Sequence, residues 1–89
     1  MGKKADFSKV KPNAPLLVSW LDIHNDEGGW KPKEEVAYSE CRVETVGWFL
    51  GAANGHLMLC ADLSQDGDTN TRMLIPFGCI VDWQVIALG

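Results

Sequence analysis

The sequence has no apolar stretch long enough to cross a membrane as a helix, which takes about 20 residues. Its lysine-containing start is not followed by the apolar core of a secretory signal peptide. Internal repeats and low-complexity tracts are also absent. We therefore expect a cytoplasmic protein of one folded domain, with no membrane contact.

Paired cysteines are missing as well. Cys41, Cys60 and Cys79 are odd in number and widely spaced, so no Cys-x-x-Cys motif of the zinc or thioredoxin type occurs. Each cysteine lies in an apolar stretch. We expect buried free thiols in a reducing cytoplasm.

Positive charge is scarce beyond the start of the chain. Residues 1–15 hold four lysines against one aspartate, whereas residues 16–89 hold four cations against eleven carboxylates. An acidic body repels phosphate groups, so nucleic acid is an unlikely partner. The contrast predicts a flexible basic leader over residues 1–15 and a small β-barrel domain over residues 16–89.

Five segments have the apolar patterning of β-strands, at residues 16–24, 40–50, 56–63, 71–75 and 80–88. Pro32, followed by Glu34 and Glu35, predicts a short helix over residues 32–38, because proline and acidic side chains suit a first helical turn. Gly47 predicts a bend or bulge in the second strand. The fold class is therefore mainly β, a small five-stranded barrel with one short helix between strands one and two.

Two turns are also predicted. Asn54-Gly55 indicates a tight hairpin, and residues 77–79 after Pro76 indicate a tight turn. On the third strand, the pattern predicts an inner face formed by four residues, namely Leu57, Leu59, Ala61 and Leu63.

The tryptophans and the first and last strands suggest how the barrel is covered. Leu16, Val18 and Trp20 share one face of the first strand, and we expect Trp20 and Trp48 in the core. Trp30 follows a glycine pair and is expected to cover the barrel mouth. Apolar residues occupy both faces of the first and last strands, which a monomeric barrel wall does not require.

The order of these residues resembles small phage and prophage proteins of uncharacterised function. The resemblance is carried by Val18-x-Trp20-x-Asp22, Gly29-Trp30, Val46-Gly47-Trp48, Leu57-x-Leu59 and Ile75-Pro76, and it spans about residues 16–88. It implies an SH3-like or Sm-like barrel in a bacterial or phage-infected host cell. The Asp-x-x-Asn and Ile-Arg-Gly stretches of Sm-like RNA binders are not reproduced here.

Two stretches have a spacing typical of metal ligands. Asp22-x-His24-x-Asp26 ends the first strand, where alternate residues face the same way. A calcium loop would need glycine at its sixth position and glutamate at its twelfth, and this stretch has neither. Asp66-x-Asp68-x-Asn70 fails the same test. We interpret both as polar loops and assign no metal ligand, although an ion in the first loop is left open.

Catalytic machinery has no local signature. The three cysteines and two histidines, His24 and His56, form no recognisable nucleophile and base pair. No glycine-rich phosphate loop precedes a helix. We therefore assign no catalytic residue and no cofactor-binding residue, and expect no cofactor.

Three functions remain as hypotheses. The first is a non-enzymatic, self-associating accessory or assembly module, and the alternatives are a nucleic-acid-binding Sm-like barrel and a small metal-dependent enzyme. The homo-oligomer is expected to cover Trp83 by pairing strand edges between subunits. The rival interpretation is that these apolar residues cover one another within one chain, helped by the leader folding back.

Overall fold

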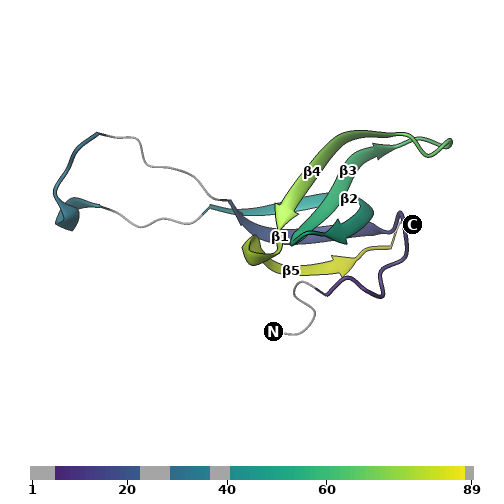
Figure 1. The fold of residues 1–89 in the computed structure, drawn as a ribbon, viewed down its shortest axis with the longest axis horizontal. Coiled ribbons are helices and arrows are strands. Elements are labelled where there is room, and N and C mark those ends of the chain that lie inside the picture. Colours follow the sequence, from purple (N-terminus) through teal and green to yellow (C-terminus); the bar gives the residue numbers. More distant parts are fainter. Residues whose placement is uncertain (1–5, 23–28, 37–40, 88–89) are drawn as a thin grey trace.

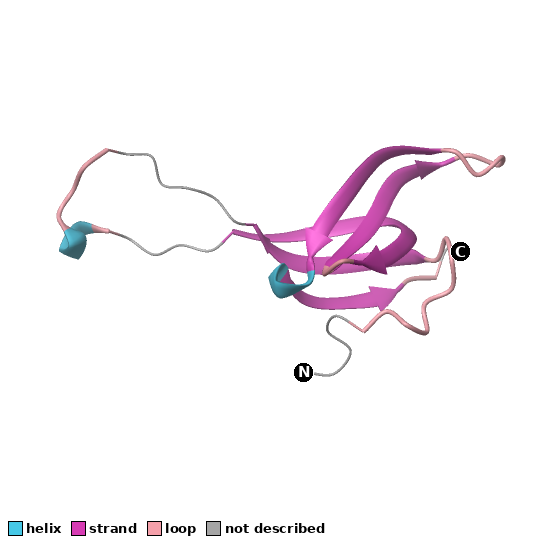
Figure 2. Ribbon diagram, viewed as in Figure 1, coloured by secondary structure: helices cyan, strands magenta, loops and turns pink. Residues whose placement is uncertain are grey.

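The computed structural model describes residues 6–22, 29–36 and 41–87. These residues form one five-stranded antiparallel sheet (Figure 1 and Figure 2). The elements in chain order are β1 (Pro15–Asp22), the 3₁₀ turn η1 (Lys33–Glu35), β2 (Cys41–Ala53), β3 (His56–Leu63), β4 (Thr69–Pro76), the 3₁₀ turn η2 (Phe77–Cys79) and β5 (Ile80–Val85). The mainly β class and the five strands are confirmed.

The sheet is curled but remains open. Its strand order is β4-β3-β2-β1-β5, so β4 and β5 lie at the two edges. The described residues contain no hydrogen-bonded ladder between β4 and β5. The predicted closed barrel is therefore wrong, because closure requires those two strands to pair.

The predicted helix over residues 32–38 is also wrong. The structure has only the 3₁₀ turn η1, and Val36 is already extended, while residues 37–38 lie outside the described part. Residues 32–36, the described part of this stretch, are all exposed. A short helix gains most of its stability from packing, and these residues bury no side chain. The described residues include no helix long and apolar enough to cross a membrane.

Two tight turns place β2, β3 and β5, and both are as predicted. Asn54 and Gly55 have φ angles of 54° and 76° and close the β2–β3 hairpin, as Asn-Gly pairs do when both central residues need positive φ. The second turn, η2, connects the two edge strands. The Phe77 N–H donates a hydrogen bond of 2.8 Å to the carbonyl oxygen of Gly55, which ties the two turns together.

Gly47 allows β2 and β3 to approach closely. A Cβ atom on this glycine would lie 3.1 Å from both the carbonyl oxygen of Cys60 and the Cβ of Leu59. The register shift in β2 falls later, between Phe49 and Gly51. The irregularity predicted at Gly47 therefore lies between Phe49 and Gly51. Gly47 itself has no room for a side chain, because β3 lies too close.

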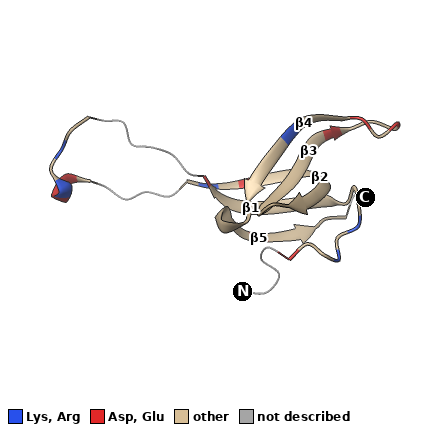
Figure 3. Ribbon diagram, viewed as in Figure 1, with Lys and Arg blue, Asp and Glu red and all other residues tan. Residues whose placement is uncertain are grey.

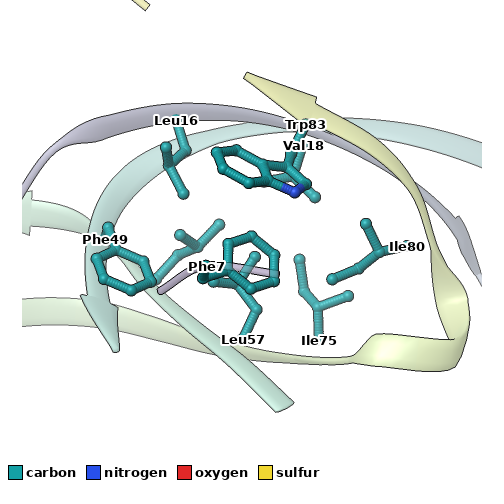
Figure 4. Close-up of a cluster of buried hydrophobic side chains, with 9 residues drawn as sticks. Phe7, Leu16, Val18, Phe49, Leu57, Ile75, Ile80 and Trp83 are labelled. Carbon is teal, nitrogen blue, oxygen red and sulfur yellow. The ribbon is translucent and has the colours of Figure 1, made fainter. Parts of the chain in front are cut away.

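The core lies on the concave face of the sheet (Figure 4). Leu16 and Val18 of β1 are fully buried, and Trp20 packs against the core as predicted. The Trp20 Nε1 donates a hydrogen bond of 2.9 Å to Thr45 Oγ1 on the neighbouring strand, so its polar end is satisfied. The buried apolar cluster consists of Phe7, Leu16, Val18, Phe49, Leu57, Leu59, Ile75, Ile80 and Trp83.

Phe7 fills the open side of this core. Its ring centroid lies 4.7 Å from that of Trp83, 5.8 Å from that of Phe77 and 6.1 Å from that of Phe49. The phenylalanine is only 5% exposed. The boundary between leader and domain at residue 15 stays a prediction, but one side chain of the predicted leader belongs to the core.

Backbone hydrogen bonds hold the segment that carries Phe7. The Asn13 N–H donates to Phe49 O at 2.9 Å, and the Phe49 N–H donates to Ala14 O at 2.7 Å. Across Phe7, the Ser8 hydroxyl and N–H both donate to Asp6 Oδ1, at 2.8 and 3.2 Å. These bonds, the hydroxyl bond first, lower the pKa of Asp6 from its ordinary value because they stabilise the carboxylate.

Trp83 is not available at the surface. It is 8% exposed and packs against Phe7 (Figure 4). The expectation that a second subunit covers Trp83 is therefore wrong for this residue. Burial within one chain, helped by the leader, explains it instead.

We expect Phe7→Ala to destabilise the fold by about 3 kcal/mol, because truncating a buried phenylalanine leaves a cavity. Phe7→Leu should cost about 1 kcal/mol, since it retains most of the apolar volume. Urea unfolding followed by circular dichroism measures both. Equal stability of Phe7→Ala and the original chain would show that the leader does not seal the core.

We expect Gly47→Ala to cost about 1–3 kcal/mol, because the added methyl would press against the backbone of β3. Gly78→Ala is the matched control, since a Cβ there meets nothing within 4 Å. Thermal melts of the two variants should separate clearly. Similar melting temperatures would mean that the approach of β2 to β3 adjusts easily.

Candidate functional site

The convex face of the sheet carries apolar side chains that the described chain leaves uncovered. Leu17 pairs with Val46, and Met58 pairs with Leu74, so these side chains lie on neighbouring strands of one face. Val46 and Leu74 are each 60% exposed. We call Leu17, Val46, Trp48, Met58 and Leu74 the outer apolar face.

Trp48 belongs to this face and not to the core. It pairs with Cys60, on the face opposite to the core residue Phe49, and it is half-buried. Its predicted core position is therefore wrong, because β2 alternates and the inward positions are Gly47 and Phe49. The cysteines are free as expected, but only Cys60 is buried, whereas Cys41 is exposed and Cys79 is half-buried.

A pocket opens beside Trp48. The β2–β3 pairing ends at Trp48 and Cys60, whereas β3 continues with β4 into a hairpin that extends past β2. The angle between them forms an open depression of about 390 Å³. Its lining consists of Trp48, Ala61, Asp62, Leu63, Ser64, Asp68, Thr69 and Asn70.

This pocket accounts for two residues expected in the core. Ala61 is exposed and Leu63 is half-buried, although both continue the alternation of Leu57 and Leu59. The β3–β4 hairpin extends past β2 at this point, so Ala61 and Leu63 no longer face the core, and both line the pocket. The predicted inner face therefore holds for the first two residues only.

The pocket combines one aromatic residue with carboxylates. Asp62 and Asp68 line it together with Trp48. The Ser64 hydroxyl accepts a hydrogen bond of 3.0 Å from the Asp68 N–H and thereby fixes the turn. An aromatic face and negative charge together suit a cationic or aromatic side chain.

The second of the two metal-like stretches, residues 66–70, does not line the pocket as one ligand set. Asp68 and Asn70 line the pocket, but Asp66 does not. Within residues 6–22, 29–36 and 41–87, no group of three metal-ligating side chains occurs. Asp22 lies at the exposed end of β1, and the other two residues of its motif, His24 and Asp26, lie outside the described residues.

His56 begins β3 and is half-buried. Its Nδ1 lies 2.9 Å from the carbonyl oxygen of Asn54, across the hairpin turn. This contact is local to the turn. It gives His56 a structural role in the hairpin.

An arm projects from the other end of the molecule. Residues 29–36 lie far from the sheet, at the end of the connection from β1 to β2 (Figure 1). Trp30 is fully exposed there. Its expected position over the barrel mouth is therefore wrong. Lysines and glutamates surround it, at Lys31, Lys33, Glu34 and Glu35 (Figure 3).

We expect Trp30 to be the tryptophan most accessible to acrylamide in dilute solution. Trp30→Phe should remove the most readily quenched and most red-shifted emission. It should change the free energy of unfolding by less than about 1 kcal/mol, because the side chain is exposed. Fluorescence quenching below micromolar protein concentration measures this. Unchanged quenching in the variant would place Trp30 in a protected position.

Comparisons with known proteins add no relative. No protein family, no curated protein and no solved structure matches this chain. The interpretation of the outer apolar face, the pocket and the arm therefore rests on their geometry and chemistry.

Proposed function

We propose that this protein is a non-enzymatic, self-associating accessory or assembly module. The observation that carries the proposal is the outer apolar face. Val46, Met58 and Leu74 extend over three neighbouring strands, and the described chain places no layer on them. An antiparallel sheet with one solvated face normally alternates apolar and polar residues, so an apolar outer face indicates a protein contact.

The open sheet adds a second reason. β4 and β5 each have one edge without a strand partner in the described chain. Asp82 is the one charged residue within β5, which gives this edge little protection against pairing. A second copy could satisfy these backbone groups.

The proposal extends to the family resemblance. A tight turn ahead of β5, at Phe77–Cys79, and the glycine that lets β2 pass close to β3 support a relation to small phage and prophage proteins with SH3-like or Sm-like architecture. A cytoplasmic location is supported by the three free cysteines.

Charge argues against the nucleic-acid alternative. Lys and Arg occur on the strands only at Arg42 and Arg72 (Figure 3). Arg72 already donates hydrogen bonds of 3.1 Å to Thr69 O and Thr69 Oγ1. Such a surface offers no continuous basic groove for a phosphate backbone.

We expect a solution mass above the 9.8 kDa of one chain at tens of micromolar protein. Size exclusion coupled to light scattering measures it. Leu74→Lys should shift the population toward the monomer, because it places a charge in the outer apolar face. Glu44→Lys is the control on the same face outside the apolar group. A monomer at all concentrations would contradict self-association.

A further inference from the structure

We infer that Thr71 is the hinge of a two-state hairpin, and that the kinked and straight states of this hairpin give the pocket beside Trp48 two different shapes. The β2–β3 ladder ends at Trp48 and Cys60, so in the described chain β3 and β4 are held only by each other beyond that point. We call residues 61–71 the distal hairpin. The inference concerns motion within one chain and does not rest on the proposed self-association.

Thr71 has a backbone conformation that its side chain disfavours. Its φ angle is 55°, in the left-handed region, although the residue lies within β4. Among the described residues, every other residue with positive φ is a glycine or an asparagine, and these adopt the region readily. A branched Cβ makes it costly, so the conformation persists only where surrounding interactions maintain it.

This strain coincides with a gap in the β3–β4 ladder. Ala61 and Thr71 lie opposite each other in the register but are not paired. The ladder continues on both sides of the gap, with the pairs Cys60–Arg72 and Asp62–Asn70. Because the register is the same on both sides, an extended conformation at Thr71 would restore the missing pair without any sliding of the strands. The straight state thus differs from the kinked state by a local change of the backbone.

Side-chain hydrogen bonds maintain the kinked state. The Thr71 N–H donates at 2.9 Å to Oδ1 of Asn70. Nη1 of Arg72 donates at 3.1 Å to both the carbonyl oxygen and Oγ1 of Thr69. Residues three apart on a straight strand point to opposite faces, so the kink brings the Arg72 guanidinium to Thr69. Backbone strain therefore favours the straight state, and these hydrogen bonds favour the kinked one.

The kink separates the two sides of the pocket. Trp48 lies on β2, where the ladder with β3 is intact, whereas all the other lining residues belong to the distal hairpin, from Ala61 to Asn70. This hairpin extends away from β2 (Figure 1). A change at Thr71 therefore moves one side of the pocket as a unit relative to Trp48. A ligand that binds one shape better would shift the hairpin toward that state.

Nuclear magnetic resonance of the isotope-labelled chain measures the fraction of the straight state. Relaxation dispersion at residues 63–69 and at the Trp48 ring reports exchange in microseconds to milliseconds. Averaged chemical shifts report faster exchange, and separate peaks report slower exchange. We expect the original chain to show a minor straight state by one of these measures, with Thr71 extended in it.

Substitutions at Thr71 should change this fraction through the backbone strain alone. Thr71→Gly removes the cost of positive φ and should lower the straight fraction about tenfold. Thr71→Val is the matched control, because it keeps the branched Cβ and should leave the fraction within about threefold of the original.

Substitution of Arg72 should act in the opposite direction. Arg72→Ala removes the hydrogen bonds to Thr69 and should raise the straight fraction about fivefold. Arg42→Ala removes an exposed charge from β2 instead and should leave the fraction unchanged. Thr71, Arg72 and Arg42 are all exposed, so the variants should fold, which circular dichroism verifies.

Three results would count against the hinge. Identical peaks for residues 63–69 in all variants, with no exchange, would show a rigid hairpin and overturn the inference. Equal straight fractions in Thr71→Gly and Thr71→Val would overturn it as well, because the branched Cβ would then store no strain. Exchange in the distal hairpin without any change at Trp48 would overturn its coupling to the pocket.

Discussion

A sheet that curls around its own apolar face, but does not close, has to cover that face with something other than another strand. In this protein a single phenylalanine does so. Phe7 contacts aromatic rings from β2, from η2 and from β5, so it reaches elements from the middle of the sheet to one of its edges. Phe7 completes the core without pairing of β4 with β5, and in the described residues these two edge strands share no ladder.

The strands were predictable because their signals are local. Alternation placed Leu16, Val18 and Leu57 on the inner face, and Asn54-Gly55 marked its hairpin from two residues. Phe7 was not predictable in this way. It stands alone in a polar, lysine-containing stretch, and its burial depends on three partners distant in sequence.

The candidate site could not be predicted from the sequence for a related reason. Trp48 and Asp62 meet only because the ladder between β2 and β3 ends at one pair, so that the β3–β4 hairpin leaves the sheet. Sequence patterns did mark Asp68 and Asn70 by their spacing, but the stretch was interpreted as a polar loop with no binding role. The helix predicted after Pro32 did not form for a different reason. Its local sequence signals favour a first helical turn, but the described residues of this stretch bury no side chain that would stabilise a helix.

The contact between Phe7 and Trp83 also determines when the core can form during synthesis of the chain. The first core residue leaves the ribosome long before its closest aromatic partner in the last strand exists. Contacts between such distant positions slow folding, because the intervening chain has to be ordered before the contact forms. Until β5 emerges, the concave face of the other four strands is exposed along with the edge of β1, and these are surfaces on which nascent chains aggregate. The protein therefore completes its core only after β5 has been made.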